Sequence, residues 1–253
     1  MKVLYFDCTN GISGDMLLNA LMELGECRAE VEGAINNENF SHVHHSHNEE
    51  RAQHHDHEHT HHGRSYNEVK HLIARSGFTQ QAREYATAIY GNIAEAEAEV
   101  HGESLETIHF HEVGRDQAIK NALGIGMAME KISPDRIAVS QIYDGKGTIV
   151  CSHGEIPVPV PAVRALMKRS TFAFLQADVD TEMVTPSGLA GLIGIGAQPA
   201  DFGNVAADNE FDPDPGTIIK KTEVYGARAT GRGGLKAYIL QINSNTGGTD
   251  GHK

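Results

Sequence analysis

The amino-acid sequence predicts an α/β fold in which strands and helices are mixed and one stretch lacks a core of its own. Strands lead directly into helices over residues 3–24 and 137–195, and a long amphipathic helix occupies residues 80–101 between them. A histidine-rich insert at residues 36–65 interrupts this pattern. The order of the strands in the sheet does not follow from these observations.

Composition excludes several classes of partner. The chain of 253 residues carries 21 basic and 34 acidic residues, a formal net charge of −13, which argues against nucleic acid or an anionic membrane as a partner. Its three cysteines, Cys8, Cys27 and Cys151, are far apart and predict no disulfide framework. With no signal peptide or membrane-spanning apolar run in view, we expect a cytoplasmic protein.

The first strand, at residues 3–8, leads through a glycine-containing loop into a helix at residues 16–24. Ser13 is the expected helix cap, and a helix N-terminus can hold a phosphate or a carboxylate. Asp7, at the end of the strand, is a candidate to hold a cation or orient a substrate group. An ordinary strand-to-helix turn is the alternative. The loop residues that we expect to bind a cofactor or substrate are Gly11, Ser13, Gly14 and Asp15.

The insert at residues 36–65 has a different character from the rest of the chain. Ten of the sixteen histidines lie between residues 42 and 62, mixed with acidic residues and almost no aliphatic ones. Such a segment cannot form a core and is expected to be flexible. It would bind nickel or zinc loosely in several geometries, which favours metal capture over a fixed catalytic site.

Helical periodicity returns at residue 66. Residues 66–77 form a short helix, and residues 80–101 form a long one whose apolar stripe alternates steps of four and three. Glu95, Glu97 and Glu99 lie mostly off this stripe and are expected to face solvent. A further helix is expected at residues 116–131.

Between these helices lies the segment His109-Phe110-His111-Glu112-Val113-Gly114. In an extended chain His109 and His111 share one face, and Glu112 follows where the chain turns. Imidazole and carboxylate donors suit borderline divalent metals, so His109, His111 and Glu112 are the candidate metal ligands. The alternative is a structural strand end whose histidines bond to the backbone.

The last third alternates extended and helical segments. Strands are expected at 137–142, 148–151 and 235–242, and a proline-stiffened extended segment at 153–161 precedes a helix at 162–169. His153 is either a ligand or a turn residue. A second helix start, with a Thr185 cap, is another candidate anion site, formed by Thr185, Ser187 and Gly188. Residues 201–215 are expected to be loop, and 243–253 a disordered tail.

In combination, these stretches resemble the N-terminal region of the LarC family of nickel-pincer cofactor biosynthesis proteins. The resemblance covers most of residues 1–235, with an N-terminal LarC-like region at 1–242. The matching pieces, in order, are Asp7 with residues 11–16, the histidine-rich segment, residues 96–102, residues 109–114, residues 153–154 with 157–159, and Glu182 with residues 185–188.

The resemblance implies an activity. LarC-like proteins insert nickel into a pyridinium mononucleotide that bears two thiocarboxylate groups, forming a nickel–carbon bond in a CTP-dependent step. The family binds CTP in a C-terminal region, so CTP is expected only together with such a region or subunit. The product serves lactate racemase and related enzymes, which makes such an apoenzyme a possible recipient of the cofactor.

The resemblance also implies roles for residues. His109, His111 and Glu112 would hold nickel, Asp7 and Asp15 would line the same crevice, and the helix starts at Ser13 and Ser187 would bind the phosphate. Glu112 or His153 would accept the ring proton, with Asp7 as a further catalytic candidate.

The sequence departs from the family at Gln117 and Asn121, where aspartates are usual. Two alternatives therefore stay open: a non-enzymatic nickel metallochaperone that relies on the histidine-rich insert, and a divergent partner subunit.

Overall fold

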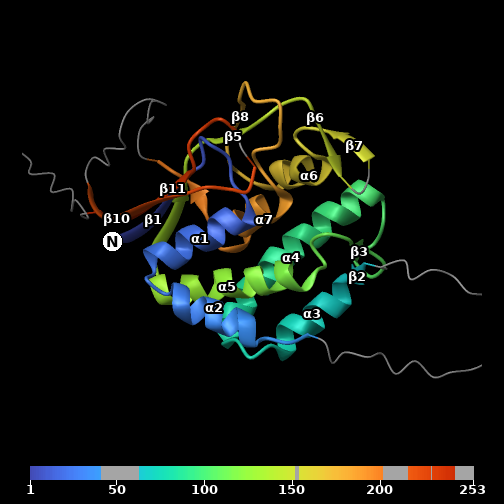
Figure 1. Cartoon of the computed structure of the whole chain (residues 1–253), viewed down its shortest axis with the longest axis horizontal. Helices are drawn as coiled ribbons and strands as arrows, with labels where there is room; N and C mark the ends of the chain where they lie inside the picture. The colour runs from blue at the N-terminus through green and yellow to red at the C-terminus, as the bar shows by residue number, and fades with distance from the viewer. Residues whose placement is uncertain (41–62, 152–153, 202–215, 229, 243–253) are drawn as a thin grey trace, which may run out of the picture.

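A computed structural model describes residues 1–40, 63–151, 154–201, 216–228 and 230–242 of the chain. A five-stranded sheet lies at one side of the molecule, and the helices pack beside it and against one another (Figure 1). The predicted mixed α/β class is confirmed.

The sheet is mixed, with strand order β10-β11-β1-β4-β9. β1 pairs in parallel with β4 and antiparallel with β11, so the first strand occupies the centre of the sheet. The strands are β1 (Lys2–Asp7), β4 (Arg136–Val139), β9 (Gln198–Pro199), β10 (Gly216–Val224) and β11 (Leu235–Ile242).

Both faces of β1 are buried, which explains why its sequence is continuously apolar. Leu4 and Phe6 point into the main core with the helices, whereas Val3 and Tyr5 join a smaller apolar cluster on the other face. Successive side chains of a strand point to opposite faces, and here both faces have apolar neighbours.

The helical part is organised around α4, which packs against α3, α5, α6 and α7. The helices are α1 (Gly14–Leu24), α2 (Arg28–Asn37), α3 (Tyr66–Arg75), α4 (Gln80–His101), α5 (Asp116–Ile132), α6 (Pro161–Arg169) and α7 (Pro186–Gly194).

The predicted bounds and stripe of α4 are confirmed, with one exception. Thr79 Oγ1 accepts a hydrogen bond from the Ala82 amide at 3.1 Å, and Gly102 ends the helix in the left-handed conformation at φ +67°. Val100, expected on the buried stripe, is 39% exposed. It lines a cavity, which accounts for the difference.

Three two-stranded pairs complete the fold. The strand expected at 137–142 is divided, because β4 ends at Val139 and β5 begins at Ile142. The segment around the prolines forms the antiparallel partner of β6, as its extended character predicts. The pairs are β2 (Arg64–Ser65) with β3 (His109–Phe110), β5 (Ile142–Asp144) with β8 (Phe174–Gln176), and β6 (Thr148–Cys151) with β7 (Gly154–Pro157).

The sequence did not predict α2 or β10. Residues 41–62 of the histidine-rich insert lie outside the described residues, as do 202–215 and 243–253. The described edges of the insert belong to the fold, because α2 runs through Asn37, Phe40 is buried and Arg64–Ser65 form β2.

Close helix packing depends on glycine. A Cβ added to Gly126 on α5 would lie 2.3 Å from the carbonyl oxygen of Ala82 on α4, and one added to Gly194 on α7 would lie 2.8 Å from the backbone nitrogen of Ile89. The backbones of α5 and α7 therefore approach α4 to a distance that only a residue without a side chain permits.

Gly126→Ala should lower the free energy of unfolding by about 1–3 kcal/mol, since α4 and α5 must move apart. Gly33→Ala is the matched control. Gly33 lies inside α2 with open space around its would-be Cβ, so the same change should raise stability by up to about 1 kcal/mol. Urea denaturation measures both, and equal effects at the two sites would contradict the packing argument.

Candidate functional site

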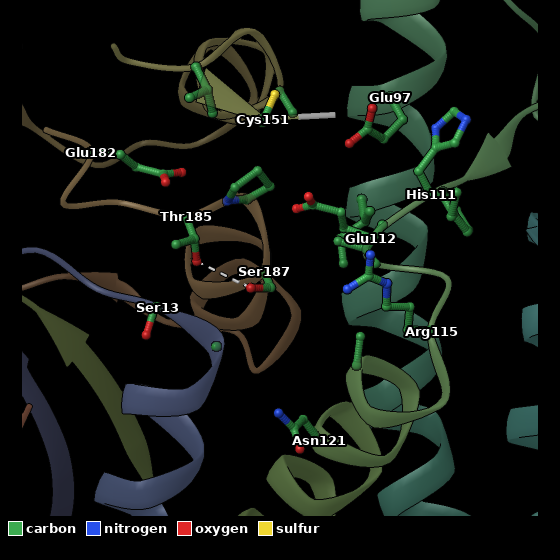
Figure 2. Close-up of a pocket in the computed structure, with 18 of the residues that line it drawn as sticks. Ser13, Glu97, His111, Glu112, Arg115, Asn121, Cys151, Glu182, Thr185 and Ser187 are labelled. Atoms are coloured by element: carbon green, nitrogen blue, oxygen red, sulfur yellow. Dashed lines mark hydrogen bonds between the residues drawn. The ribbon is translucent and has the colours of Figure 1, made fainter. Parts of the chain in front are cut away.

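A cavity of about 780 Å³ lies between the helices and the β6–β7 hairpin (Figure 2). This volume is typical of a site for a small ligand or nucleotide. Segments far apart in the sequence line it, from the loop before α1, α4, the β3–α5 connection, the hairpin, and the starts of α6 and α7.

The first residues of four helices line this cavity, which is its main electrostatic feature. The first amides of a helix have no partner within the helix and carry its positive end, so each helix start favours an anion. The lining residues are Ser13, Gly14 and Asp15 of α1, Arg115 and Gln117 of α5, Pro161 and Ala162 of α6, and Pro186 and Ser187 of α7.

The starts of α1 and α7 are joined through their backbones. Ile12 forms a parallel bridge with Val184, its amide donates to the Met183 carbonyl at 2.9 Å, and its carbonyl accepts from the Thr185 amide at 3.0 Å. These bonds bring together the two predicted anion sites, whose caps Ser13 and Thr185 are 172 positions apart in the sequence.

Two predicted binding glycines make this junction possible but do not line the cavity. Gly11 adopts φ +82°, and a Cβ there would lie 2.2 Å from the Met183 carbonyl oxygen. A Cβ on Gly188 would lie 2.6 Å from the Ile12 carbonyl oxygen. Their observed role is to permit close backbone contact.

The expected helix caps are confirmed. Ser13 Oγ accepts from the Met16 amide at 3.2 Å, and Thr185 Oγ1 accepts from the Gly188 amide at 3.1 Å. Thr185 Oγ1 also lies 3.2 Å from Ser187 Oγ, and the two hydroxyls stand together beside the cavity (Figure 2).

Asp7 lies outside the cavity lining. Its Oδ1 accepts from the amide and the hydroxyl of Thr9, at 3.1 and 2.7 Å, which stabilises the turn after β1. His153 lies outside the described residues. It was also expected to have a catalytic role.

The three predicted metal ligands, His109, His111 and Glu112, all line the cavity. His109 Nδ1 lies 2.7 Å from the carbonyl oxygen of Thr107, which can only accept, so in the neutral ring Nδ1 carries the proton and Nε2 has the lone pair. Figure 2 shows the Glu112 carboxylate pointing into the cavity. Among the described residues, no three His, Cys, Asp or Glu side chains converge closely enough to form a metal site.

The α4 wall differs in part from expectation. Glu95 and Glu99 lie on the surface and form ion pairs with Arg169 and Lys168 of α6. Glu97, expected to face solvent, instead lines the cavity, and its Oε2 lies 3.5 Å from His101 Nε2. In Figure 2 its carboxylate points toward Cys151 on the hairpin.

Amide side chains hold Asp15 in place at the start of α1. Asn121 Nδ2 donates to Asp15 Oδ1 at 2.6 Å, and Gln117 Nε2 donates to Asn121 Oδ1 at 2.8 Å. Because both departures are amides, Asn121 donates to this carboxylate and Gln117 donates to Asn121, where two aspartates would repel Asp15.

Glu182 and Arg228 are cavity residues that sequence reasoning did not assign to the site. The Glu182 side chain is 5% exposed and pairs with Arg228, which is 51% exposed. Burial raises the pKa of Glu182 above its ordinary value, and Arg228 offsets part of that effect. The sequence contains one indication that Glu182 belongs to the site: it is among the residues that match the LarC family.

Asp144 fixes the backbone next to Glu182. Its Oδ1 accepts from the amides of Gly145, Met183 and Val184 at 2.8, 2.8 and 3.0 Å, whereas its buried Oδ2 has no hydrogen-bond partner. Burial raises the pKa of Asp144, and the three amide bonds counteract this.

A family model described as nickel insertion protein matches residues 4–203. The chain belongs to this family.

Relatives in the nickel insertion family carry an informative name. Three proteins named pyridinium-3,5-bisthiocarboxylic acid mononucleotide nickel insertion protein are 36%, 34% and 32% identical to the chain, from Acetivibrio thermocellus, Akkermansia muciniphila and Lactiplantibacillus plantarum. The matches cover 92%, 79% and 94% of this chain but 58%, 52% and 60% of the relatives. The chain thus spans somewhat more than half the length of these relatives.

No solved structure matches the chain. Among the described helices of this family member, none is long and apolar enough to cross a membrane.

Asp144→Ala should lower the free energy of unfolding by about 3 kcal/mol or more, because three buried amides lose their acceptor. Asp144→Asn should cost less, since its amide oxygen can accept the same bonds. Urea denaturation at pH 7 tests this order, and equal losses for the two variants would contradict it.

The two Asp144 proteins should also differ in pH dependence. A raised carboxyl pKa means that the folded state holds a proton that the unfolded state releases above pH 3.8. This group's contribution to stability therefore falls as the pH rises from 3.8 through the folded pKa. Asp144→Asn should lose that decline, measured as the difference between the two stability profiles.

Proposed function

We propose that this chain takes part in nickel insertion into pyridinium-3,5-bisthiocarboxylic acid mononucleotide, as a nickel chelatase or cyclometallase component. The observation that carries the proposal is the cavity lined by four helix starts, with the His-Phe-His-Glu segment on its wall. Membership of the nickel insertion family and the name of its relatives supply the substrate.

The charge of the substrate suits this cavity. A mononucleotide phosphate and two thiocarboxylates make the molecule strongly anionic, whereas the protein carries a formal net charge of −13. The helix starts, together with Arg115 and Arg228, supply groups that can bind anions, although the lining also holds four acidic side chains, Asp15, Glu97, Glu112 and Glu182. The joined starts of α1 and α7, with Ser13 and Ser187, are the proposed phosphate site.

Nickel is the cargo of this reaction. His109, His111 and Glu112 are the proposed donors, since imidazole and carboxylate bind borderline divalent metals. They line one cavity but do not converge on one point in this structure, so their side chains would have to turn toward the ion. The lone pair on His109 Nε2 is available because Nδ1 donates to Thr107. When the substrate enters the cavity, its sulfur atoms, which are softer ligands, would then bind the nickel ion in place of the protein donors.

The CTP-dependent step belongs to the partners. We propose that CTP acts with a C-terminal region or subunit of the family type, and that a lactate racemase-type apoenzyme receives the product. In this arrangement the described cavity supplies the sites for the pyridinium substrate and for nickel.

The test is nickel transfer to the thiolated mononucleotide with nickel(II), CTP and the C-terminal region supplied, followed by mass spectrometry. The unchanged chain should give the metallated product. His109→Ala/His111→Ala should reduce its yield at least ~10-fold, through loss of metal donors. Absence of product from the unchanged chain under these conditions would refute the proposal.

Isothermal titration of nickel into a variant lacking residues 41–62 separates insertion from storage. The ten histidines at residues 42–62 favour the metallochaperone alternative. If one tight site survives the deletion and is lost with His109→Ala/His111→Ala, the cavity holds nickel itself. If all binding leaves with residues 41–62, metal storage is the better description.

The partner-subunit alternative has its own test. Gln117→Asp/Asn121→Asp restores the carboxylates usual in the family. A gain of activity in this variant would indicate a divergent subunit, whereas a loss is expected if the amides are needed to hold Asp15.

A further inference from the structure

We propose that Glu182 is the general base that removes the ring proton when the nickel–carbon bond forms. The inference rests on the proposed function and adds to it a catalytic residue that lies opposite the metal-binding segment. It replaces Glu112 and His153 as the proton acceptor.

The reaction needs such a base. The thiocarboxylates occupy ring carbons 3 and 5, so a nickel ion held by both sulfurs lies against carbon 4. There the C–H bond breaks, its electron pair forms the carbon–nickel bond, and the proton passes to a carboxylate, which becomes a carboxylic acid. Nickel remains divalent, so no oxidant or reductant is required.

Glu182 has the position that this step requires. Its side chain lines the cavity, and Figure 2 shows its carboxylate facing Glu112 across the open space. With the phosphate at the starts of α1 and α7 and nickel delivered from the Glu112 side, the ring would lie between the two carboxylates.

The backbone around Glu182 is held firmly. The next two amides, of Met183 and Val184, donate to the buried carboxylate of Asp144, and the Met183 carbonyl accepts from Ile12. The base therefore sits on the same junction that sets the starts of α1 and α7. A backbone held in this way favours proton transfer, because little entropy is lost in bringing the carboxylate and the C–H group into the right geometry.

Burial makes Glu182 a better base than the other acids of the cavity. Glu112 and Asp15 are exposed and the Glu97 side chain is 21% exposed, whereas the Glu182 side chain is 5% exposed. Burial, the charges of Asp144 and Glu112, and the opposing charge of Arg228 combine to leave the pKa of Glu182 raised. A carboxylate with a raised pKa holds the transferred proton more strongly.

Arg228 is the ion-pair partner of the proposed base. Its guanidinium pairs with Glu182 and favours the ionised carboxylate, which opposes the effect of burial on the pKa of Glu182. Once Glu182 accepts the proton, the pair loses its charge attraction. Arg228 is half exposed and can then turn toward the anionic substrate.

The experiment is single-turnover metallation with CTP and the C-terminal region present, using substrate with hydrogen or deuterium at carbon 4. Glu182→Gln should slow metallation by ~100-fold or more, as expected for loss of a general base. Its substrate affinity, measured by titration, should change less than ~3-fold, since the glutamine keeps shape and polarity. Glu182→Asp should recover part of the rate, and Glu97→Gln, on the α4 wall of the same cavity, is the matched control carboxylate.

The outcomes separate the two proposals. If the unchanged chain forms no product, the proposed function fails. If it forms product and Glu182→Gln metallates at a similar rate, or Glu97→Gln slows metallation as much as Glu182→Gln does, the base assignment is overturned and nickel insertion stands. Loss of substrate affinity in Glu182→Gln equal to the loss of rate would also overturn it, indicating a binding role.

A second variant covers the case in which Glu182→Gln does not fold. Arg228→Gln keeps the carboxylate but removes the cation that lowers its pKa. The acidic limb of the rate–pH profile should then move to higher pH, because Glu182 stays protonated over a wider range. An unmoved limb would overturn the assignment.

Discussion

The arrangement of the cavity depends on one backbone junction, where the segment before α1 meets the segment before α7. Ile12 bonds to both Met183 and Thr185, and the approach is close enough to require glycine at positions 11 and 188. Glu182 comes directly before this junction, and the carboxylate of Asp144 accepts hydrogen bonds from the amides of Met183 and Val184 within it. A single set of backbone contacts thus places two helix starts and a buried carboxylate relative to each other.

Local sequence was sufficient for the elements that have strong local signals. The bounds of α4 followed from its apolar stripe, and Gly102 marked its end. α2 was missed because it buries only Val31 and Ile35 and has no side-chain cap at Cys27. β10 was missed because its place at the sheet edge is set by pairing with β11, and pairing between distant strands leaves little trace in either strand alone.

Much of the candidate site was also predictable, because helix caps and ligand-type residues are recognisable in a sequence. Ser13, Ser187 and the His-Phe-His-Glu residues were each found separately, and the fold brings them to one cavity. Their convergence, the contributions of α5 and α6, and the buried pair of Glu182 and Arg228 were beyond local reasoning. All three features depend on which distant segments pack together in the fold. The burial of a carboxylate, in particular, can be known only once its neighbours are known.

The four helix starts have a consequence for how such a site can change over generations. An attraction built from main-chain amides is insensitive to most single substitutions, because every residue except proline carries the same N–H group. Side chains around the cavity can diverge while the proposed affinity for anions persists. The vulnerable positions are the glycines at the junction, where any added atom would push the two helix starts apart. Mutational tolerance in this protein should therefore be broad around the ligand and narrow at a few positions that never touch it.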